Sequence, residues 1–170
     1  EIIKEKPRLD RLPPFGELCT QGLTDAPSLL IEDHSGIQLA GLEGANKDLS
    51  YRAAMLAGDN DLLAVFGERD ELFETYCSER LQLGSPKVLL PSASNSTATL
   101  AEACLRDDQF LETAVQIAKS AGELNVIPYM ATGGVWHLAA EIAKRSQTLV
   151  RVAGPSPLLM RAVNDKLWFS

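Results

Sequence analysis

The 170-residue sequence lacks the features that assign a chain to several protein classes at once. Its three cysteines, Cys19, Cys77 and Cys104, are widely separated and form no CxxC pair, which argues against a disulfide framework or a zinc cluster. We expect Cys77 and Cys104, which fall among apolar helical positions, to be buried and unreactive. No apolar run approaches the length of a membrane span and no basic-then-apolar leader opens the chain, so we expect a cytoplasmic protein without a membrane partner.

The chain also lacks an excess of positive charge. It has 16 basic and 23 acidic residues, which gives a formal net charge of −7. Non-specific binding to nucleic acid needs cationic side chains that displace counterions from phosphates, so we expect no nucleic-acid partner. The rest of the composition, with 45% hydrophobic and 23% charged residues, is ordinary for a soluble protein and allows the core of one domain to form.

Familiar signatures of nucleotide and acyl-transfer chemistry are missing. The sequence has no GxGxxG and no GxxxxGK[ST] glycine-rich loop, which argues against a dinucleotide site and a P-loop. It has no GxSxG elbow, and with only His34 and His137 no Ser-His-Asp triad can be assembled. The sequence therefore identifies no self-contained active site in these residues.

The sequence does contain a proline-rich start followed by short apolar runs. Residues 1–27 carry four prolines without sustained periodicity, which predicts an N-terminal arm on the surface of the domain. Residues 28–31 and 37–42 are apolar, and the turn-forming residues between them predict a β-hairpin. A polar, glycine-containing segment comes next, and a short helix is expected around residues 51–57.

A regular alternation of patterns begins at residue 62. Continuous apolar runs predict buried strands, and apolar residues at helical spacing predict the helices between them. We expect strands at 62–66, 88–90, 126–130 and 149–152, and helices at 72–80, 107–121 and 132–145. Gly122 suits the left-handed end of a helix, and Thr132 suits the cap of the next one. Residues 28–153 therefore predict an α/β domain with an open, mainly parallel sheet and helices on both faces.

Two loops follow strands of this sheet, where helix N-termini present free N–H groups to ligands. Thr132, Gly133 and Gly134 allow close backbone approach, so a phosphate or carboxylate could dock there; a simple tight turn is the alternative. The loop at 92–99 is rich in hydroxyls and could bind an anion or a sugar; a solvated loop that caps the following helix is the alternative. Its candidate binding residues are Ser92, Ser94, Asn95 and Ser96. His137 could reach the same cleft, although a lone histidine is more often structural.

The C-terminal part of the sequence carries a more specific set. Gly154 and Pro155 follow a predicted strand, and Arg161, Asp165 and Lys166 come after them in a short helical stretch. This order resembles the junction in ATP-grasp enzymes, in particular those similar to biotin carboxylase. In that family a strand ends in Gly-Pro, a short helix carries an arginine, and an Asp-Lys pair opens the ATP-grasp module.

The resemblance covers residues 124–170 and implies a Rossmann-like, pre-ATP-grasp domain. Residues 154–170 would be the junction to an ATP-grasp module beyond Ser170, so the chain reads as a truncated ligase. Lys166 looks like the family's lysine that contacts the nucleotide, and ATP and Mg²⁺ would be cofactors of the full-length protein. That protein would activate a small carboxylate substrate as an acyl phosphate and transfer it to an amine, and these residues alone would be inactive.

Two other functions stay open at this point. The chain could be a stand-alone α/β module that binds a small anion at the loops 92–99 and 132–134 without catalysis. It could also be a structural or partner-binding domain whose N-terminal arm packs on another subunit, so a homodimer is among the options. The glycine-rich phosphate loop and the magnesium-binding carboxylates of an ATP-grasp module have no counterpart in the sequence.

Overall fold

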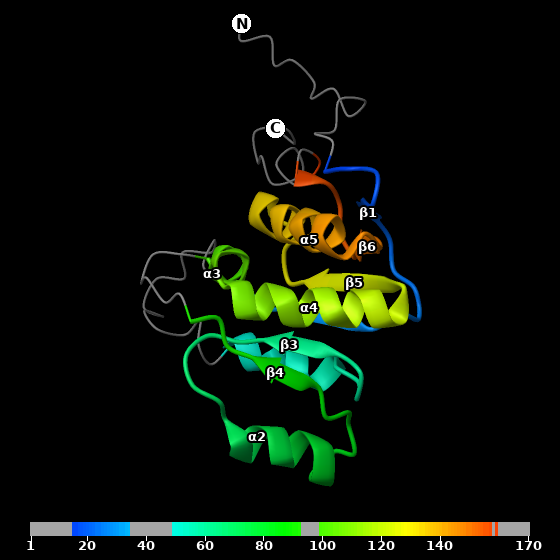
Figure 1. Cartoon of the computed structure of the whole chain (residues 1–170). Helices are drawn as coiled ribbons and strands as arrows, with labels where there is room; N and C mark the ends of the chain where they lie inside the picture. The colour runs from blue at the N-terminus through cyan, green and yellow to red at the C-terminus, as the bar shows by residue number, and fades with distance from the viewer. Residues whose placement is uncertain (1–14, 35–48, 93–98, 158, 160–170) are drawn as a thin grey trace, which may run out of the picture.

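A computed structural model of the chain describes residues 15–34, 49–92, 99–157 and 159 (Figure 1). Within them, six strands form one sheet in the order β1-β6-β5-β2-β3-β4, and every neighbouring pair is parallel. The strands are β1 (Cys19–Gln21), β2 (Ser28–Ile31), β3 (Leu62–Ala64), β4 (Lys87–Leu89), β5 (Glu123–Pro128) and β6 (Leu149–Val152). The predicted open, parallel α/β sheet is confirmed.

Helices cover both faces of this sheet. They are the 3-10 helix η1 (Tyr51–Leu56), α2 (Glu71–Thr75), the π-helix η2 (Tyr76–Arg80), α3 (Leu100–Arg106), α4 (Asp108–Ala121) and α5 (Gly133–Ser146). Helices α3, α4 and α5 pack on one face, against side chains such as Leu29, Ile31 and Val126. Helices η1 and η2 pack on the other face, against Leu30 and Leu63. Figure 1 shows α4 in front of the sheet and η1 behind it.

Strand β2 lies in the middle of the sheet and is buried along its whole length. It pairs in parallel with β3 on one edge and with β5 on the other. The prediction of a β-hairpin on residues 28–31 is wrong, because both edges of β2 are already hydrogen-bonded to other strands. The predicted hairpin partner, 37–42, lies outside the described residues.

The segment predicted as an N-terminal arm contains an edge strand that the sequence did not reveal. Residues 19–21 form β1, which pairs with β6, while residues 1–14 lie outside the described part of the chain. Asn125, fully buried on β5, fixes the link between β1 and β2. Its amide group donates to the carbonyls of Thr24 and Ala26 and accepts from the Thr24 N–H. These three hydrogen bonds hold the link between β1 and β2 against β5.

The helix ends predicted at Gly122 and Thr132 are confirmed, and the structure contains one further helix before α4. Gly122 adopts φ +79 after α4, and the Thr132 side chain accepts from the Val135 N–H at the start of α5. A separate helix, α3, precedes α4, and the chain breaks between them at Asp107, whose backbone is extended. The helix predicted over 72–80 starts as α2 and continues as the π-helix η2. None of the helices in the described ranges is long and apolar enough to cross a membrane.

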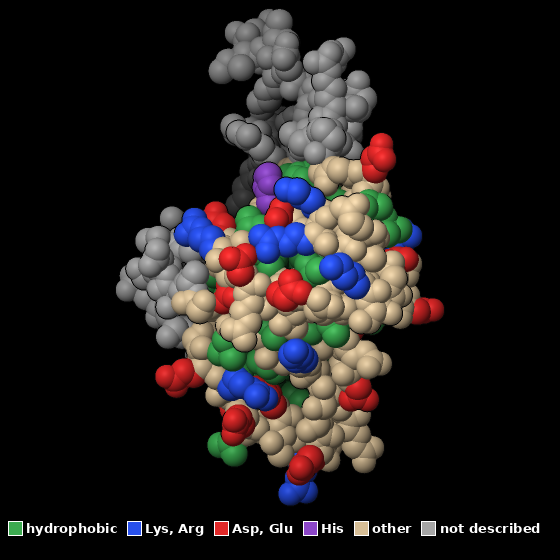
Figure 2. Space-filling model, viewed as in Figure 1, with side chains coloured by type: hydrophobic (Ala, Val, Ile, Leu, Met, Phe, Trp, Pro, Cys, Tyr) green, Lys and Arg blue, Asp and Glu red, His purple; other side chains and the backbone are tan. Residues whose placement is uncertain are grey.

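Charged side chains of both signs cover the described surface. On the face shown in Figure 2, Lys and Arg side chains are interspersed with Asp and Glu side chains. An example is Arg145 on α5, which pairs with Glu141 one turn earlier and with Asp108 on α4. Exposed pairs of this kind contribute little stability.

Asp107 ties the end of β4 to the start of α4. Its Oδ1 accepts from the Phe110 N–H at 2.9 Å, and its Oδ2 accepts from both the N–H and the hydroxyl of Ser92 at 2.6 Å. These bonds, the Ser92 hydroxyl foremost, hold the pKa of the Asp107 carboxyl below its ordinary value. The charged form is therefore favoured in the folded state.

We predict that Asp107→Ala lowers the free energy of unfolding by about 1–2 kcal/mol at pH 7, the usual cost of losing a helix cap. The folded pKa is depressed, so the contribution is present above the unfolded value of about 3.9 and is lost as the pH falls through the folded pKa. Urea denaturation at pH 7 and pH 3 measures this difference. The neighbouring Asp108→Ala is the control and should cost little; an Asp107→Ala cost that is equal at both pH values would contradict the account.

Gly84 lies against the backbone of another loop. A Cβ atom at this position would lie 2.5 Å from the Cα and carbonyl carbon of Gly58 and 2.6 Å from the carbonyl oxygen of Ala57. Backbone atoms cannot move aside as the end of a side chain can. The chain therefore requires glycine here, where the segment after η2 passes the loop after η1.

We predict that Gly84→Ala destabilises the fold by about 1–3 kcal/mol, the range for overpacking a close contact. Gly133→Ala is the matched control, because Gly133 is the first residue of α5 and a Cβ there would have no atom within 4 Å. Thermal unfolding of the two variants and the wild type checks the difference. Equal midpoints for all three proteins would show that the contact at Gly84 is not tight.

Candidate functional site

Among the described strands, the strand order reverses between β2 and β5, which makes this a topological switch point. The chain leaves β2 through η1 on one face to reach β3, and leaves β5 through α5 on the other face to reach β6. The two connections diverge at the carboxyl ends of adjacent parallel strands, which is where open α/β sheets bind ligands. Glu32, Asp33 and His34 follow β2 at this point, and Tyr129 follows β5.

A buried charge cluster occupies the end of β2. Glu32 is 7% exposed and His34 is 3% exposed. The Glu32 Oε1 lies 3.0 Å from the His34 Nε2 and 3.3 Å from the Nε of Arg52 on η1. Both partners offset the cost of burying the Glu32 carboxylate. Asp33 points elsewhere and accepts from the Leu100 N–H at the start of α3, at 2.6 Å.

The ring of Tyr129 covers His34. The two ring centroids are 4.0 Å apart with an interplanar angle of 32°, and the tyrosine itself is about half exposed. The backbone N–H of Tyr129 donates to the Ile31 carbonyl at 2.9 Å, so the β2–β5 pairing sets the position of the ring. Imidazole, carboxylate and guanidinium are thus held in fixed relative positions at the switch point.

Beside this cluster a pocket of about 520 Å³ opens between the sheet and η1. Its floor is apolar and includes Leu30, Ile127 and Pro128, and Met55 and Leu56 of η1 form one wall. The polar residues of its described lining are Glu32, Arg52 and Tyr129. An apolar pocket with a few convergent polar groups is the usual form of a small-molecule site.

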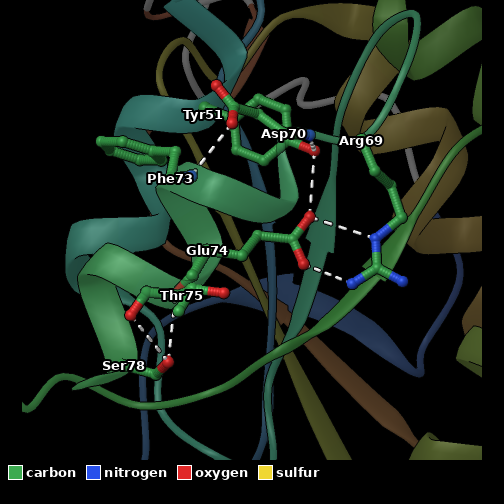
Figure 3. A network of polar contacts seen from close by, with 7 residues as sticks. All are labelled: Tyr51, Arg69, Asp70, Phe73, Glu74, Thr75 and Ser78. Carbon is green, nitrogen blue, oxygen red and sulfur yellow. Dashed lines mark hydrogen bonds and ion pairs between the residues drawn. The ribbon is translucent and has the colours of Figure 1, made fainter.

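A second pocket of about 640 Å³ lies on the other side of Arg52 and Met55, which line both. Tyr51 and Asp70 of its lining belong to the polar network drawn in Figure 3. The Tyr51 hydroxyl accepts from the Asp70 N–H at 2.7 Å and donates to Glu74 at 3.1 Å, and Arg69 pairs with Glu74. Burial raises the pKa of Tyr51 to about 12, so its hydroxyl keeps its proton. The network ties η1 to α2 and thereby fixes the helix that carries Arg52.

The hydroxyl-rich loop expected to bind ligand is described only at its start. Ser92 is exposed, but its N–H and hydroxyl both donate to Asp107, which gives it a structural contact. Ser94, Asn95 and Ser96 lie outside the described residues. A ligand-binding role for this loop stays a prediction.

The second predicted loop lies at the N-terminus of α5, directly after β5. Thr132 caps the helix and Gly133 is its first residue. A Cβ on Gly134 would lie 3.6 Å from the Cβ of Ala101 on α3, an ordinary van der Waals distance, so packing does not require glycine at this position. His137 is exposed, and its ring lies edge-on to Phe15 at 5.7 Å between centroids.

The strand and Gly-Pro of the predicted junction are in the described part of the chain. A Cβ on Gly154 would lie 2.6 Å from the Cβ of Ala131, and the Pro155 carbonyl accepts from the Trp136 Nε1 at 3.1 Å. Gly154 thus turns closely past the end of β5. Arg161, Asp165 and Lys166 lie outside the described residues.

The switch-point residues Glu32, Arg52 and Tyr129 were not among the sequence candidates, and His34 was assigned to a hairpin turn. A signal was present: three polar, ionisable residues directly follow the apolar run at 28–31. If that run is taken as a central parallel strand, they fall at its carboxyl end.

The cysteines offer no reactive group. Cys19, Cys77 and Cys104 are all buried and free, which confirms the predicted burial of the last two. Burial raises the pKa of Cys19 to about 11 and that of Cys104 well above its ordinary value, so the thiolate is disfavoured at both. No group of three or more His, Cys, Asp or Glu side chains that could hold a metal ion occurs in the described ranges.

Comparison with known proteins places this fold in a family. The family model described as "Pre ATP-grasp domain" matches residues 50–143, which is more than half of the chain and runs from the start of η1 into α5. Comparisons with curated proteins and with solved structures give no match. The parallel sheet and the family match agree, and the chain belongs to the pre-ATP-grasp domain family.

Proposed function

We propose that this chain is the N-terminal domain of an ATP-dependent ligase of the ATP-grasp superfamily, which joins a carboxylate to an amine. The observation that carries this proposal is the match to the pre-ATP-grasp family over residues 50–143. The open pocket at the switch point supports it, because a domain that contributes to a substrate cleft needs such a concave site. The stand-alone anion binder is not favoured, because the family match associates the fold with a second module.

The chemistry proposed for the whole enzyme proceeds through an acyl phosphate. A carboxylate oxygen attacks the γ-phosphorus of ATP, and ADP leaves. The amine nitrogen then attacks the carbonyl carbon of the acyl phosphate, and inorganic phosphate leaves as the amine loses a proton. Bound Mg²⁺ would offset negative charge on the transferred phosphoryl group. The described residues of this domain do not provide a carboxylate cluster for that ion, so no step here is assigned to a metal held by them.

This domain's own part would be to bind and orient the substrate. The switch-point pocket supplies an apolar surface and fixed charges. The N-terminus of α5, at Thr132, Gly133 and Gly134, would add backbone N–H groups near the same sheet edge. The loop with Ser92, Ser94, Asn95 and Ser96 would add hydroxyl and amide contacts. Holding the reacting groups in place contributes to rate by removing orientational freedom before the reaction.

The proposal predicts ATP-dependent carboxylate activation by the complete gene product. With Mg²⁺, ATP, hydroxylamine and a panel of small carboxylic acids, the enzyme should release ADP and form a hydroxamate, because hydroxylamine captures an acyl phosphate. Hydroxamate formation without ATP, or no ADP release with any acid of a broad panel, would overturn the assignment.

The nucleotide role of Lys166 is tested in the same assay. Lys166→Ala should raise the KM for ATP by about tenfold or more, the effect of losing one charge-assisted contact to the nucleotide. Lys144→Ala, on the exposed end of α5, is the control and should leave this KM unchanged. An unchanged KM in Lys166→Ala would remove Lys166 from the nucleotide site.

A further inference from the structure

The Glu32 side chain lines the pocket, and only one of its two carboxylate oxygens has a partner among the described residues. Its Oε1 contacts the His34 Nε2 and the Arg52 Nε. Its Oε2 accepts no hydrogen bond from the described residues. In the part of the chain that the structure describes, every buried side-chain oxygen and nitrogen has a partner. Since Glu32 lines the pocket, its Oε2 is reached from the pocket and can accept from a ligand. The Glu32 side chain is nine-tenths buried and keeps one acceptor available to a donor in the pocket that it lines.

Arg52 supplies donors next to this acceptor. Its Nε is paired with Glu32, and its two terminal nitrogens have no partner among the described residues. The side chain is 58% exposed and lines the pocket. The terminal guanidinium nitrogens suit a carboxylate, which can accept two parallel N–H donors.

Part of the remaining described lining is apolar surface in contact with water. Leu56 is 77% exposed, and Met55 and Tyr129 are each about half exposed. These residues face Ile127 and Pro128 of β5. A ligand with an apolar body would remove this surface from water, which is favourable by about 25 cal/mol per Å².

The adjacent opposite charges select the head group. A ligand with only a carboxylate would meet the Glu32 oxygen beside Arg52, and a ligand with only an ammonium would meet the guanidinium beside Glu32. A zwitterion satisfies both at once, because its ammonium and carboxylate are joined through one carbon, as Glu32 and Arg52 are held together by their ion pair. We infer that this pocket binds an apolar α-amino acid, with its ammonium on the Glu32 Oε2, its carboxylate on Arg52 and its side chain against Met55 and Leu56.

His34 acts as a positioning residue in this site. It holds the Glu32 Oε1 at 3.0 Å and is itself held in place by the Tyr129 ring. The contact occupies Oε1 and leaves the other oxygen of Glu32 available to a ligand. The inference rests on the proposed function, since it names an apolar amino acid as a substrate of the ligase, but the binding can be measured without any turnover.

Isothermal titration calorimetry on the full chain tests the inference with L-phenylalanine as the probe. Its two analogues, 3-phenylpropionate and 2-phenylethylamine, each lack one charged group and should bind at least about tenfold more weakly. L-Leucine, L-methionine and L-tryptophan complete the panel. Equal binding of L-phenylalanine and 3-phenylpropionate, or no binding of any of the four amino acids, would overturn the assignment.

Variants locate the two contacts. Glu32→Gln and Arg52→Met should each weaken L-phenylalanine by at least about tenfold, because each removes one charge-assisted contact. Arg106→Gln, an exposed position at the end of α3, is the matched control and should bind as the wild type does. Because Arg52 also offsets the burial of the Glu32 carboxylate, thermal unfolding is measured for both variants, and the analogue series on the wild type tests the inference without any variant. Wild-type affinity in Arg52→Met would overturn the carboxylate contact.

The two proposals fail in different ways. If L-phenylalanine binds but the complete gene product forms no hydroxamate with any acid, the ligase assignment fails and the amino-acid site stands. If hydroxamate forms with other acids and none of the four amino acids binds, the amino-acid site fails and the ligase assignment stands.

Discussion

The parallel pairing of β2 with β3 on one edge and β5 on the other is the constraint on which the rest of the structure depends. It buries β2 on both faces and places the next residues, Glu32 to His34, where the two crossover connections diverge. A carboxylate buried there without partners would cost several kcal/mol, so the position requires compensation from His34 and Arg52. Arg52 lies on η1. The position of β2 in the sheet therefore also determines where η1 is held, and with it the pocket between η1 and the sheet.

Much of the fold could be predicted from local patterns. The apolar run at 62–66 predicts a buried strand, and the helical spacing at 107–121 predicts a helix with one buried face. Gly122 and Thr132 predict helix ends, because glycine adopts positive φ and the threonine side chain caps a free N–H. The edge strand β1 could not be predicted, because three residues are too short for a period and its pairing with β6 joins distant parts of the chain. The turn residues after β2 suggested a hairpin, because a four-residue apolar run does not reveal which strands lie beside it.

The candidate site was less accessible to sequence reasoning. Hydroxyls and glycines suggested the loops at 92–99 and 132–134, and in the described residues Ser92 and Thr132 serve as ties and caps of α4 and α5. The charge cluster is formed by residues from η1 and from the ends of β2 and β5, which only the strand order brings together. A strand order that runs outward from β2 and then returns to β5 cannot be read from residue spacing. The family match identifies the chain as a pre-ATP-grasp domain. The positions of the cluster's side chains show which charged groups line the pocket.

The most direct test of this account is an NMR titration of the ¹⁵N-labelled chain with L-phenylalanine. If the switch point is the binding site, the largest amide shift changes will fall at Glu32, His34, Arg52 and Tyr129, at the ends of β2 and β5 and on η1. Changes confined to Ser92 and to the α5 N-terminus at 132–134, with the switch-point amides unmoved, would contradict it.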